Sequence, residues 1–419
     1  MPSEQNTNAL YLCYFGLREP LVQTQVLPYL REIKKINGMK ISLLTFEVNF
    51  KEIWTSENIE KQKKELAAED IDWYCLAYHK TPSVPATFYD TLAGAFKTWK
   101  LIRKKNIDVL HARVHIPALM GAIAKKLSRR KTKLIFDIRG FFPEEYTDAG
   151  SWKKNGLIYR TVKIIEKWLL KEADGFVVLT EKARAILFPE SKETGFDAAG
   201  RPVEVIPCCV DLRRFEISGE QSKREIRSQY NLENRFVITY IGSFGSWYLA
   251  DEMADLLSAS LRQDDKTFAL ILTQSAPEIM TKKLVARGFT ENDFLVKKAS
   301  HGEIPRFLSA SDAALSFIKP CYSKLSSSPT KIAEYLASGT PVVANSGVGD
   351  IEEQIEGDGV GVIIENFNQE SYLEALQKIK EMEDGNLSEK CKTSALNRFD
   401  LERIGGEKYR RLYRRLLQK

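Results

Sequence analysis

The stretch "SSSPTKIAEYLASGTPVVANSGVGD", residues 326–350, combines a sharply bounded helix with the strand that follows it. Ser328 is a natural N-cap and Pro329 a natural first helical residue, because a proline at that position loses no hydrogen bond. Gly339 suits the position just after a helix, and Pro341 prevents the helix from continuing. We therefore predict a short helix that begins and ends abruptly, followed by the buried strand "TPVVAN".

The predicted helix places different side chains on its two sides. Ile332 and Leu336 belong to an apolar stripe that would pack on a sheet, whereas Thr330, Lys331 and Glu334 lie on the other side. A helix N-terminus binds phosphate through its free N–H groups and its dipole. Glu334 lies about 6 Å along the axis from Thr330, where a carboxylate can accept hydrogen bonds from a ribose diol. The pattern fits a grip for a nucleoside diphosphate, and also an ordinary capped helix with Lys331 and Glu334 as solvated charges.

Short apolar runs alternate with segments of helical period along most of the chain, which indicates parallel sheets covered by helices. The alternation breaks at residues 207–235, which are polar and lack a strand pattern, and then resumes. We predict two doubly wound domains, residues 1–212 and 213–398, and a terminal helix in residues 399–419 that packs across one or both. The predicted strands are ALYLCYF, MKISLLTF, IDWYCLA, IDVLHA, KLIFDI, GFVVLT and VEVIP in the first domain, then FVITYIG, TFALILT, DFLVKKA, DAALSFI, TPVVAN and VGVIIE.

Ligands of open α/β sheets bind where the strands end at their carboxyl edge, so two such domains would face a shared cleft. Gly242, Ser243 and Gly245 directly follow the strand FVITYIG, and glycines there permit a phosphate to approach the backbone. A tight turn explains the same residues without a ligand. In the first domain Asp137 and Arg139 follow the strand KLIFDI; the carboxylate could orient an acceptor hydroxyl and the guanidinium could neutralise phosphate charge, or the two could form a structural pair.

The composition, 43% hydrophobic and 28% charged residues in a chain of 419, is that of a soluble globular protein. No run approaches the roughly 18 apolar residues of a membrane-spanning helix, and the start of the chain lacks a leader pattern, so we expect a cytoplasmic protein. The six cysteines form no CxxC pair and there are only four histidines, so we expect neither a zinc site nor a disulfide framework.

The net charge of +6 is concentrated in a few runs. These are residues 125–133, residues 153–171 and the terminal "YRRLYRRLLQK". Such runs are ordinarily solvated helix faces, but they also suit an anionic membrane surface or a phosphate-bearing substrate. Because interleaved aromatic RNA-binding motifs are missing, we expect no nucleic-acid partner.

The stretch "SSPTKIAEYLASGTPVVANSGVGD" resembles the donor-binding signature of retaining GT-B glycosyltransferases of family 4, also called group 1. Further similarity is found in "VEVIPCCVDLRRFE", "VITYIGSFGSWYLADEM", "IPRFLSASDAALSFI" and "FDLERIGGEKYRRLY", so the resemblance covers most of the chain. It implies two Rossmann-like domains facing a cleft. It also implies that Ser328, Thr330, Lys331 and Glu334 bind the donor, together with the Gly242 loop and the loop at Gly16 after the first strand.

The sequence departs from the family pattern at two places. The family has a Glu at each end of an E-x7-E span, but Ser326 stands at the first position, and Lys319 or Lys324 could supply positive charge nearby. In "DVLHARVHIP" Arg113 stands where the family often has its catalytic histidine. His111 keeps a position that we interpret as structural, and His115 could substitute for the missing histidine or cap a helix.

The resemblance implies a retaining transfer of sugar from a nucleoside diphosphate donor to a hydroxyl of a saccharide or lipid-linked acceptor, in the synthesis of cell-surface polysaccharide or glycoconjugate. Arg113, Asp137 and Arg139 would be its catalytic residues, and the reaction would need neither a metal nor a further cofactor. Two alternatives stay open: a nucleotide-sugar epimerase of the same fold, and a catalytically degenerate subunit that binds a partner.

Overall fold

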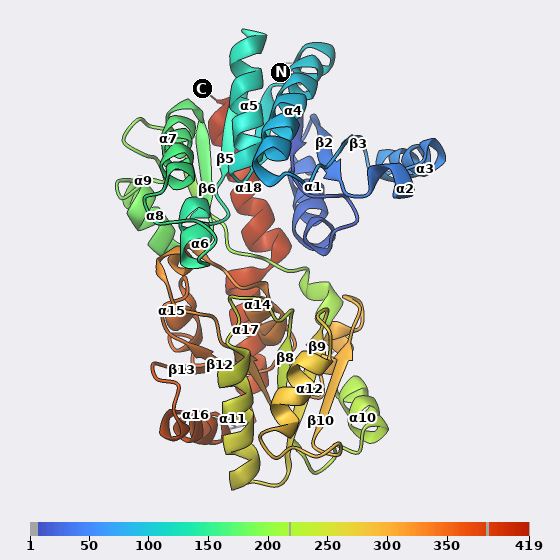
Figure 1. Ribbon diagram of the computed structural model, residues 1–419, viewed down its shortest axis with the longest axis vertical. Helices are drawn as coiled ribbons and strands as arrows, with labels where there is room; N and C mark the ends of the chain where they lie inside the picture. The colour runs from blue at the N-terminus through green and yellow to red at the C-terminus, as the bar shows by residue number, and fades with distance from the viewer. Residues whose placement is uncertain (1–6, 218, 383–384, 419) are drawn as a thin grey trace. The chain divides into compact units, whose positions relative to one another are not determined.

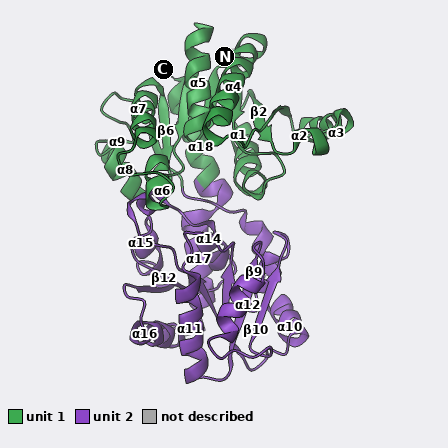
Figure 2. Cartoon of the chain, viewed as in Figure 1, with its two compact units in different colours: residues 1–206, 405–419 green, residues 207–404 purple. Residues whose placement is uncertain are grey.

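The computed structural model describes residues 7–217, 219–382 and 385–418, and the chain forms two compact units (Figure 1, Figure 2). Unit 1 consists of residues 1–206 and 405–419, and unit 2 of residues 207–404. The predicted boundaries after residues 212 and 398 each lie six residues from those of the units. Residues 405–419, which contain most of the predicted terminal helix, belong to unit 1.

Unit 1 is built on a parallel sheet of seven strands in the order β3-β2-β1-β4-β5-β6-β7. Most of these strands are short, nearly continuous apolar runs, as is typical of parallel strands buried on both faces. Leu10, Leu43, Leu110 and Phe136 are fully buried in its core. The strands are β1 (Thr7–Leu12), β2 (Met39–Glu47), β3 (Ile71–Ala77), β4 (Val109–Arg113), β5 (Lys133–Asp137), β6 (Gly175–Val178) and β7 (Val203–Val205).

Helices cover this sheet, and the last helix of the chain returns to it. The apolar side of α18 carries Tyr409, Leu412, Tyr413 and Leu416, all of them buried, and packs against α1 and β7. The helices of unit 1 are η1 (Val22–Val26), α1 (Leu27–Lys34), α2 (Phe50–Ile53), α3 (Ser56–Ala67), α4 (Ser83–Lys105), α5 (His115–Ser128), α6 (Phe142–Asp148), α7 (Leu157–Glu172), α8 (Glu181–Leu187), α9 (Ser191–Thr194) and α18 (Glu407–Leu417).

Unit 2 repeats the plan with a parallel sheet of six strands in the order β10-β9-β8-β11-β12-β13. The strands are β8 (Phe236–Ile241), β9 (Thr267–Thr273), β10 (Phe294–Lys298), β11 (Ala313–Ser316), β12 (Val342–Asn345) and β13 (Gly361–Ile364). The helices are η2 (Leu212–Phe215), α10 (Glu220–Gln229), α11 (Ala250–Gln263), α12 (Glu278–Val285), α13 (Ile304–Leu308), η3 (Tyr322–Ser326), α14 (Thr330–Ala337), α15 (Ile351–Ile355), α16 (Gln369–Met382) and α17 (Leu387–Phe399), with η4 (Leu401–Gly406) at the unit boundary. The prediction of two parallel α/β sheets is confirmed.

Helix α14 is the helix predicted from the opening stretch. Gly339 has the predicted left-handed conformation after its end, with φ of +77°. The predicted N-cap is wrong: Pro329 occupies the capping position, and the hydroxyl of Ser328 instead accepts a hydrogen bond from the N–H of Cys208 at 3.0 Å. Ser328 therefore fastens the first residues of unit 2 to this helix.

Candidate functional site

Lys331, on the first turn of α14, is a buried charged group of unit 2. It is only 7% exposed, and its Nζ donates a hydrogen bond to the hydroxyl of Tyr240 at 3.1 Å. The same ammonium lies 4.1 Å from the ring centroid of Tyr240 and 4.0 Å from that of Tyr248. It forms no ion pair with a carboxylate of the residues described, and burial lowers its pKa to about 7. A cation held by two aromatic rings and one hydroxyl, without an ion pair, is suited to an incoming anion.

Glu334 lies one turn further along the same helix and is 8% exposed. Its Oε1 is 4.0 Å from Nδ1 of His301, and Nη2 of Arg214 donates to the carbonyl of His301 at 2.8 Å. Burial raises the pKa of Glu334 to about 7, although the charges of Arg214 and Lys331 oppose that shift. The alternative in which Lys331 and Glu334 are solvated charges is therefore wrong.

The loop after β8 is built around the same lysine. Gly242 has a φ of +132°, and a Cβ added there would lie 3.1 Å from Nζ of Lys331. The hydroxyl of Tyr240 donates to the carbonyl of Ser243 at 2.9 Å, which fixes the loop beside the helix. A Cβ on Gly245 would meet no atom within 4 Å, so this part of the loop is open. The structure brings Gly242, Ser243 and Lys331 together, as the sequence predicts.

Tyr335 connects the helix to the sheet and was not singled out from the sequence. Its hydroxyl accepts the N–H of Ile241 at 2.8 Å and donates to the carbonyl of Leu315 at 3.0 Å. These contacts join α14 to β8 and β11 beside the Gly242 loop. An aromatic residue inside a helix is indistinguishable in the sequence from ordinary core, so only the polar end of this tyrosine marks its role.

A second buried lysine lies in η3, before α14. Lys324 is 7% exposed, and its Nζ lies 3.9 Å from the ring centroid of Trp247. Ser326, which replaces the first acid of the family pattern, is buried and donates to the carbonyl of Ser323 at 2.7 Å. Lys324 rather than the exposed Lys319 thus adds positive charge to the interior of this region.

Unit 1 contains a buried cluster of charges at the ends of β4 and β5. Asp137 has no exposed surface; its Oδ2 accepts a hydrogen bond from the hydroxyl of Tyr409 at 3.0 Å and lies 3.9 Å from Nη1 of Arg113. Its Oδ1 is 3.7 Å from Nη1 of Arg139. Burial alone would raise the pKa of Asp137, but Arg139, His111 and Arg113 beside the carboxylate lower it to about 2. The structure brings the three predicted catalytic residues together, with the carboxylate between the two guanidinium groups.

The two histidines of this strand end have different partners. His111 is fully buried and shares a 3.0 Å hydrogen bond with the hydroxyl of Tyr413, in agreement with a structural role. Nε2 of His115 lies 2.9 Å from Oε2 of Glu166, and its ring stacks on Phe142. His115 is the first residue of α5 and makes no capping bond, so that alternative is wrong.

The loop at Gly16 is organised by carboxylates. The N–H of Gly16 donates to Oε1 of Glu19 at 3.1 Å, and the N–H of Leu17 donates to Oε1 of Glu47 at 2.9 Å. A Cβ on Gly16 would lie 3.0 Å from Oε2 of Glu47. Both N–H groups are already engaged, which leaves neither of them available for a phosphate in this structure. Nothing in the sequence connects Glu47 with this loop, because the two are 30 residues apart.

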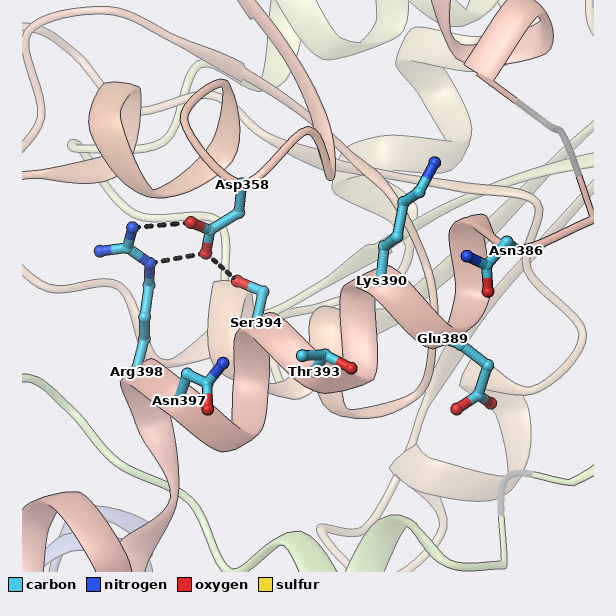
Figure 3. Close-up of a pocket in the computed structure, with 8 residues that line it drawn as sticks. All are labelled: Asp358, Asn386, Glu389, Lys390, Thr393, Ser394, Asn397 and Arg398. Carbon is cyan, nitrogen blue, oxygen red and sulfur yellow. Dashed lines mark hydrogen bonds and ion pairs between the residues drawn. The ribbon is translucent and has the colours of Figure 1, made fainter.

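A cavity of about 550 Å³ lies elsewhere on unit 2, along α17 (Figure 3). Arg398 donates two hydrogen bonds to the carboxylate of Asp358, at 2.6 and 2.7 Å, and Ser394 donates a third (Figure 3). None of the predicted site residues lines this cavity. Asp358 and Arg398 satisfy each other, and Glu389 pairs with Lys392 outside the cavity, so these groups have the chemistry of a structural surface.

Two family models match the chain, one in each half. Residues 59–214 match Glycosyltransferase Family 4, and residues 222–398 match Glycosyl transferases group 1. A 2-deoxystreptamine glucosyltransferase from Streptomyces kanamyceticus is 27% identical over 196 residues, which are 45% of this chain and 47% of that protein. The match thus spans about half the length of that curated relative.

Solved structures share the fold over nearly the whole chain. A glycosyltransferase from Rickettsia africae has a TM-score of 0.71 and 16% identity, over 99% of this chain and all of that one. HepE from Anabaena, in complex with UDP and glucose, has a TM-score of 0.68 and 16% identity, over 97% of this chain and all of that one. With one family model on each α/β unit and the signature helix placed at the sheet edge, the chain belongs to the group 1 glycosyltransferases of GT-B fold.

Proposed function

We propose that this chain transfers a sugar from a nucleoside diphosphate donor, held by unit 2, to a hydroxyl of a saccharide or lipid-linked acceptor, held by unit 1. The observation that carries the proposal is the buried ammonium of Lys331, which lies against two aromatic rings and forms no ion pair with a carboxylate of the described residues. The membership of the group 1 family and the UDP and glucose in the HepE complex support the same assignment.

In this proposal the diphosphate binds at the N-terminus of α14. The free N–H groups of the helix, the Gly242 loop and Lys331 would contact its oxygens, and Glu334 would accept hydrogen bonds from the ribose diol. The diphosphate leaves with the full negative charge of the broken bond, so a desolvated cation fixed in advance stabilises the transition state more than the bound donor. No cofactor besides the donor is required.

In unit 1 the proposed roles divide between contact and positioning. Asp137 has no exposed surface, so it acts by holding Arg113 and Arg139 at the strand ends. The arginines would then face the negative charge of a substrate. We further propose that the transfer retains the configuration of the sugar, that it serves polysaccharide or glycoconjugate synthesis, and that it takes place at the cytoplasmic side of a membrane.

The proposal is tested by thermal unfolding of the protein with UDP, GDP, ADP and TDP sugars. One nucleotide at 100 times its dissociation constant should stabilise the wild type by about 2.7 kcal/mol. The shift should disappear in Glu334→Ala and persist in Lys319→Met, which changes an exposed lysine. If no nucleotide shifts the transition, the protein is a non-catalytic subunit, and if donor alone is converted to a new nucleotide sugar, it is an epimerase.

A further inference from the structure

Helix α4 of unit 1 exposes an apolar stripe along its outer side. Val84, Phe88, Leu92 and Phe96 follow one another at intervals of four residues, and they are 62%, 65%, 48% and 54% exposed. Residues four apart on a helix lie one above the other, so the four side chains form one continuous row. We call this row the α4 stripe. A soluble protein rarely leaves so many large apolar side chains together in water.

The α4 stripe is separate from the side of α4 that packs in the core of unit 1. The opposite side of α4 is already packed on α5, where a Cβ on Gly94 would lie 2.5 Å from Sδ of Met120. Ala95, Leu101 and Ile102 are buried on that inner side. Helix α4 thus has two apolar sides, of which the fold of unit 1 uses one.

Cations continue the stripe toward the C-terminal end of the helix. Lys100 lies 4.3 Å from the ring centroid of Phe96, and Arg103 lies 5.4 Å from that of Trp99. Neither Lys100, Arg103 nor Lys104 forms an ion pair with any residue that the structure describes. The apolar part of the row therefore ends in charges that no carboxylate of the described residues neutralises.

The neighbouring helix α7 also carries exposed apolar side chains followed by lysines. Helix α5 packs between α4 and α7, and Figure 1 shows α4 and α5 side by side. On α7, Leu157 and Ile164 are 83% and 68% exposed, and the exposed Lys167 and Lys171 follow them. From residue 83 to residue 172 the sequence has 19 Lys and Arg against eight Asp and Glu, a net charge of +11 in a chain whose total is +6.

The other basic run of the sequence has a different function. On α18, Arg411 and Arg415 are paired with Glu204, and Arg410 is paired with Glu32. These arginines fasten the last helix to unit 1. At the end of α5, Lys125 and Lys126 are likewise paired, with Asp174 and Glu172. The cations of unit 1 that lie beside exposed apolar side chains are those of α4 and α7.

We propose that the α4 stripe inserts into the headgroup layer of an anionic lipid bilayer, with the cations of α4 and α7 in contact with the lipid phosphates. Aromatic and aliphatic side chains beside Lys and Arg on one helix are the composition of helices that lie in a membrane interface. A second copy of the chain is the less suitable occupant, because a twofold contact would place this cationic face against itself. Under the proposed function, this contact would place the acceptor-binding unit at the lipid surface. Binding to lipid can nevertheless be measured without any sugar transfer.

The experiment is co-sedimentation of the full chain with phosphatidylcholine vesicles, with and without about one third phosphatidylglycerol. The wild type should bind the anionic vesicles and be released by high salt. Phe88→Ser/Phe96→Ser should lower the partition coefficient about tenfold or more, since the inserted apolar surface is lost. Lys100→Glu/Lys104→Glu should lower it by a similar factor through the charges.

Two variants in unit 2 serve as matched controls. Val285→Ser removes an apolar side chain that is 54% exposed, and Lys378→Glu reverses an exposed cation; both should bind as the wild type does. The wild type failing to bind anionic vesicles, or both double variants binding unchanged, would overturn the proposal. A wild-type dimer that the Phe88→Ser/Phe96→Ser variant dissociates would overturn it in favour of a second copy. Nucleotide binding by unit 2, measured by thermal shift in each variant, tests the proposed function separately.

Discussion

In unit 2 the ammonium of Lys331 donates to the hydroxyl of Tyr240 at 3.1 Å and lies 4.1 Å from the centre of the same ring. The ring compensates part of the hydration free energy that the cation loses on burial, but a carboxylate would compensate more of it. The arrangement therefore leaves the protein less stable than it could be and keeps positive charge available for a ligand. Such local conflicts with stability are expected at functional sites.

The first prediction concerns Lys331→Met. Methionine fills the same space without a buried charge, so the free energy of unfolding at pH 7 should stay the same or rise. The affinity for the cognate nucleotide should fall by about 2 kcal/mol or more, because charge-assisted hydrogen bonds to the diphosphate are lost. Urea unfolding and isothermal calorimetry measure the two effects, and Lys319→Met should change neither. An unchanged affinity in Lys331→Met would exclude this lysine from the donor site.

The second prediction concerns pH. Because the pKa of free Lys331 is lowered to about 7, the side chain is increasingly neutral above that pH, whereas a bound diphosphate favours the charged form. Binding must then take up a proton, and the affinity should fall by up to about tenfold per pH unit above 7. Glu334, whose pKa is raised to about 7, loses its own proton over the same range, and its carboxylate is the form that would accept from the ribose diol. Its ionisation therefore offsets the trend near pH 7, and the fall in affinity should be clear from about pH 8 upward. Calorimetry at pH 8 in two buffers of different ionisation enthalpy should detect the proton, and Lys331→Met should abolish it.

The third prediction compares two glycines of one loop. Gly242→Ala places a Cβ 3.1 Å from Nζ of Lys331 on a backbone with φ of +132°, so it should cost about 1–3 kcal/mol of stability and weaken nucleotide binding. Gly245→Ala meets no atom within 4 Å and should leave the free energy of unfolding within about 0.5 kcal/mol of the wild type. Equal losses of stability in the two variants would contradict the close approach seen at Gly242.

The secondary structure of the chain could be predicted because it is encoded locally. Each of the thirteen predicted strands corresponds to one of the strands from β1 to β13, since short apolar runs between helical periods have few other solutions. The end of α14 was likewise predictable, because glycine at residue 339 adopts the left-handed conformation without strain.

The environment of the charged groups could not be predicted, because distant residues determine it. Lys331 is buried rather than solvated because Tyr240, 91 residues earlier, lies beneath it. Asp137 is enclosed by Tyr409, which comes 272 residues later on the terminal helix. A pattern confined to one helix and its caps contains no information about either partner.

The last prediction concerns Asp137. In Asp137→Asn two buried guanidinium groups lose their shared carboxylate, and this should lower the free energy of unfolding by about 3–5 kcal/mol at pH 7. The pKa of Asp137 in the folded chain is about 2, below the ordinary value of 3.8. Its contribution is therefore fully present above pH 4 and is lost as the pH falls toward 2, by about 2 kcal/mol.

Urea unfolding of the wild type and of Asp137→Asn across this range should show the two stabilities converging in acid, whereas Tyr409→Phe should cost only about 1 kcal/mol at pH 7. These effects follow from the burial of Asp137 and are those of a residue that positions others. Turnover should therefore fall in Asp137→Asn because the arrangement of Arg113 and Arg139 changes. If Asp137→Asn abolishes turnover while the stability stays as in the wild type, the carboxylate acts on a substrate directly, and a motion of unit 1 must expose it.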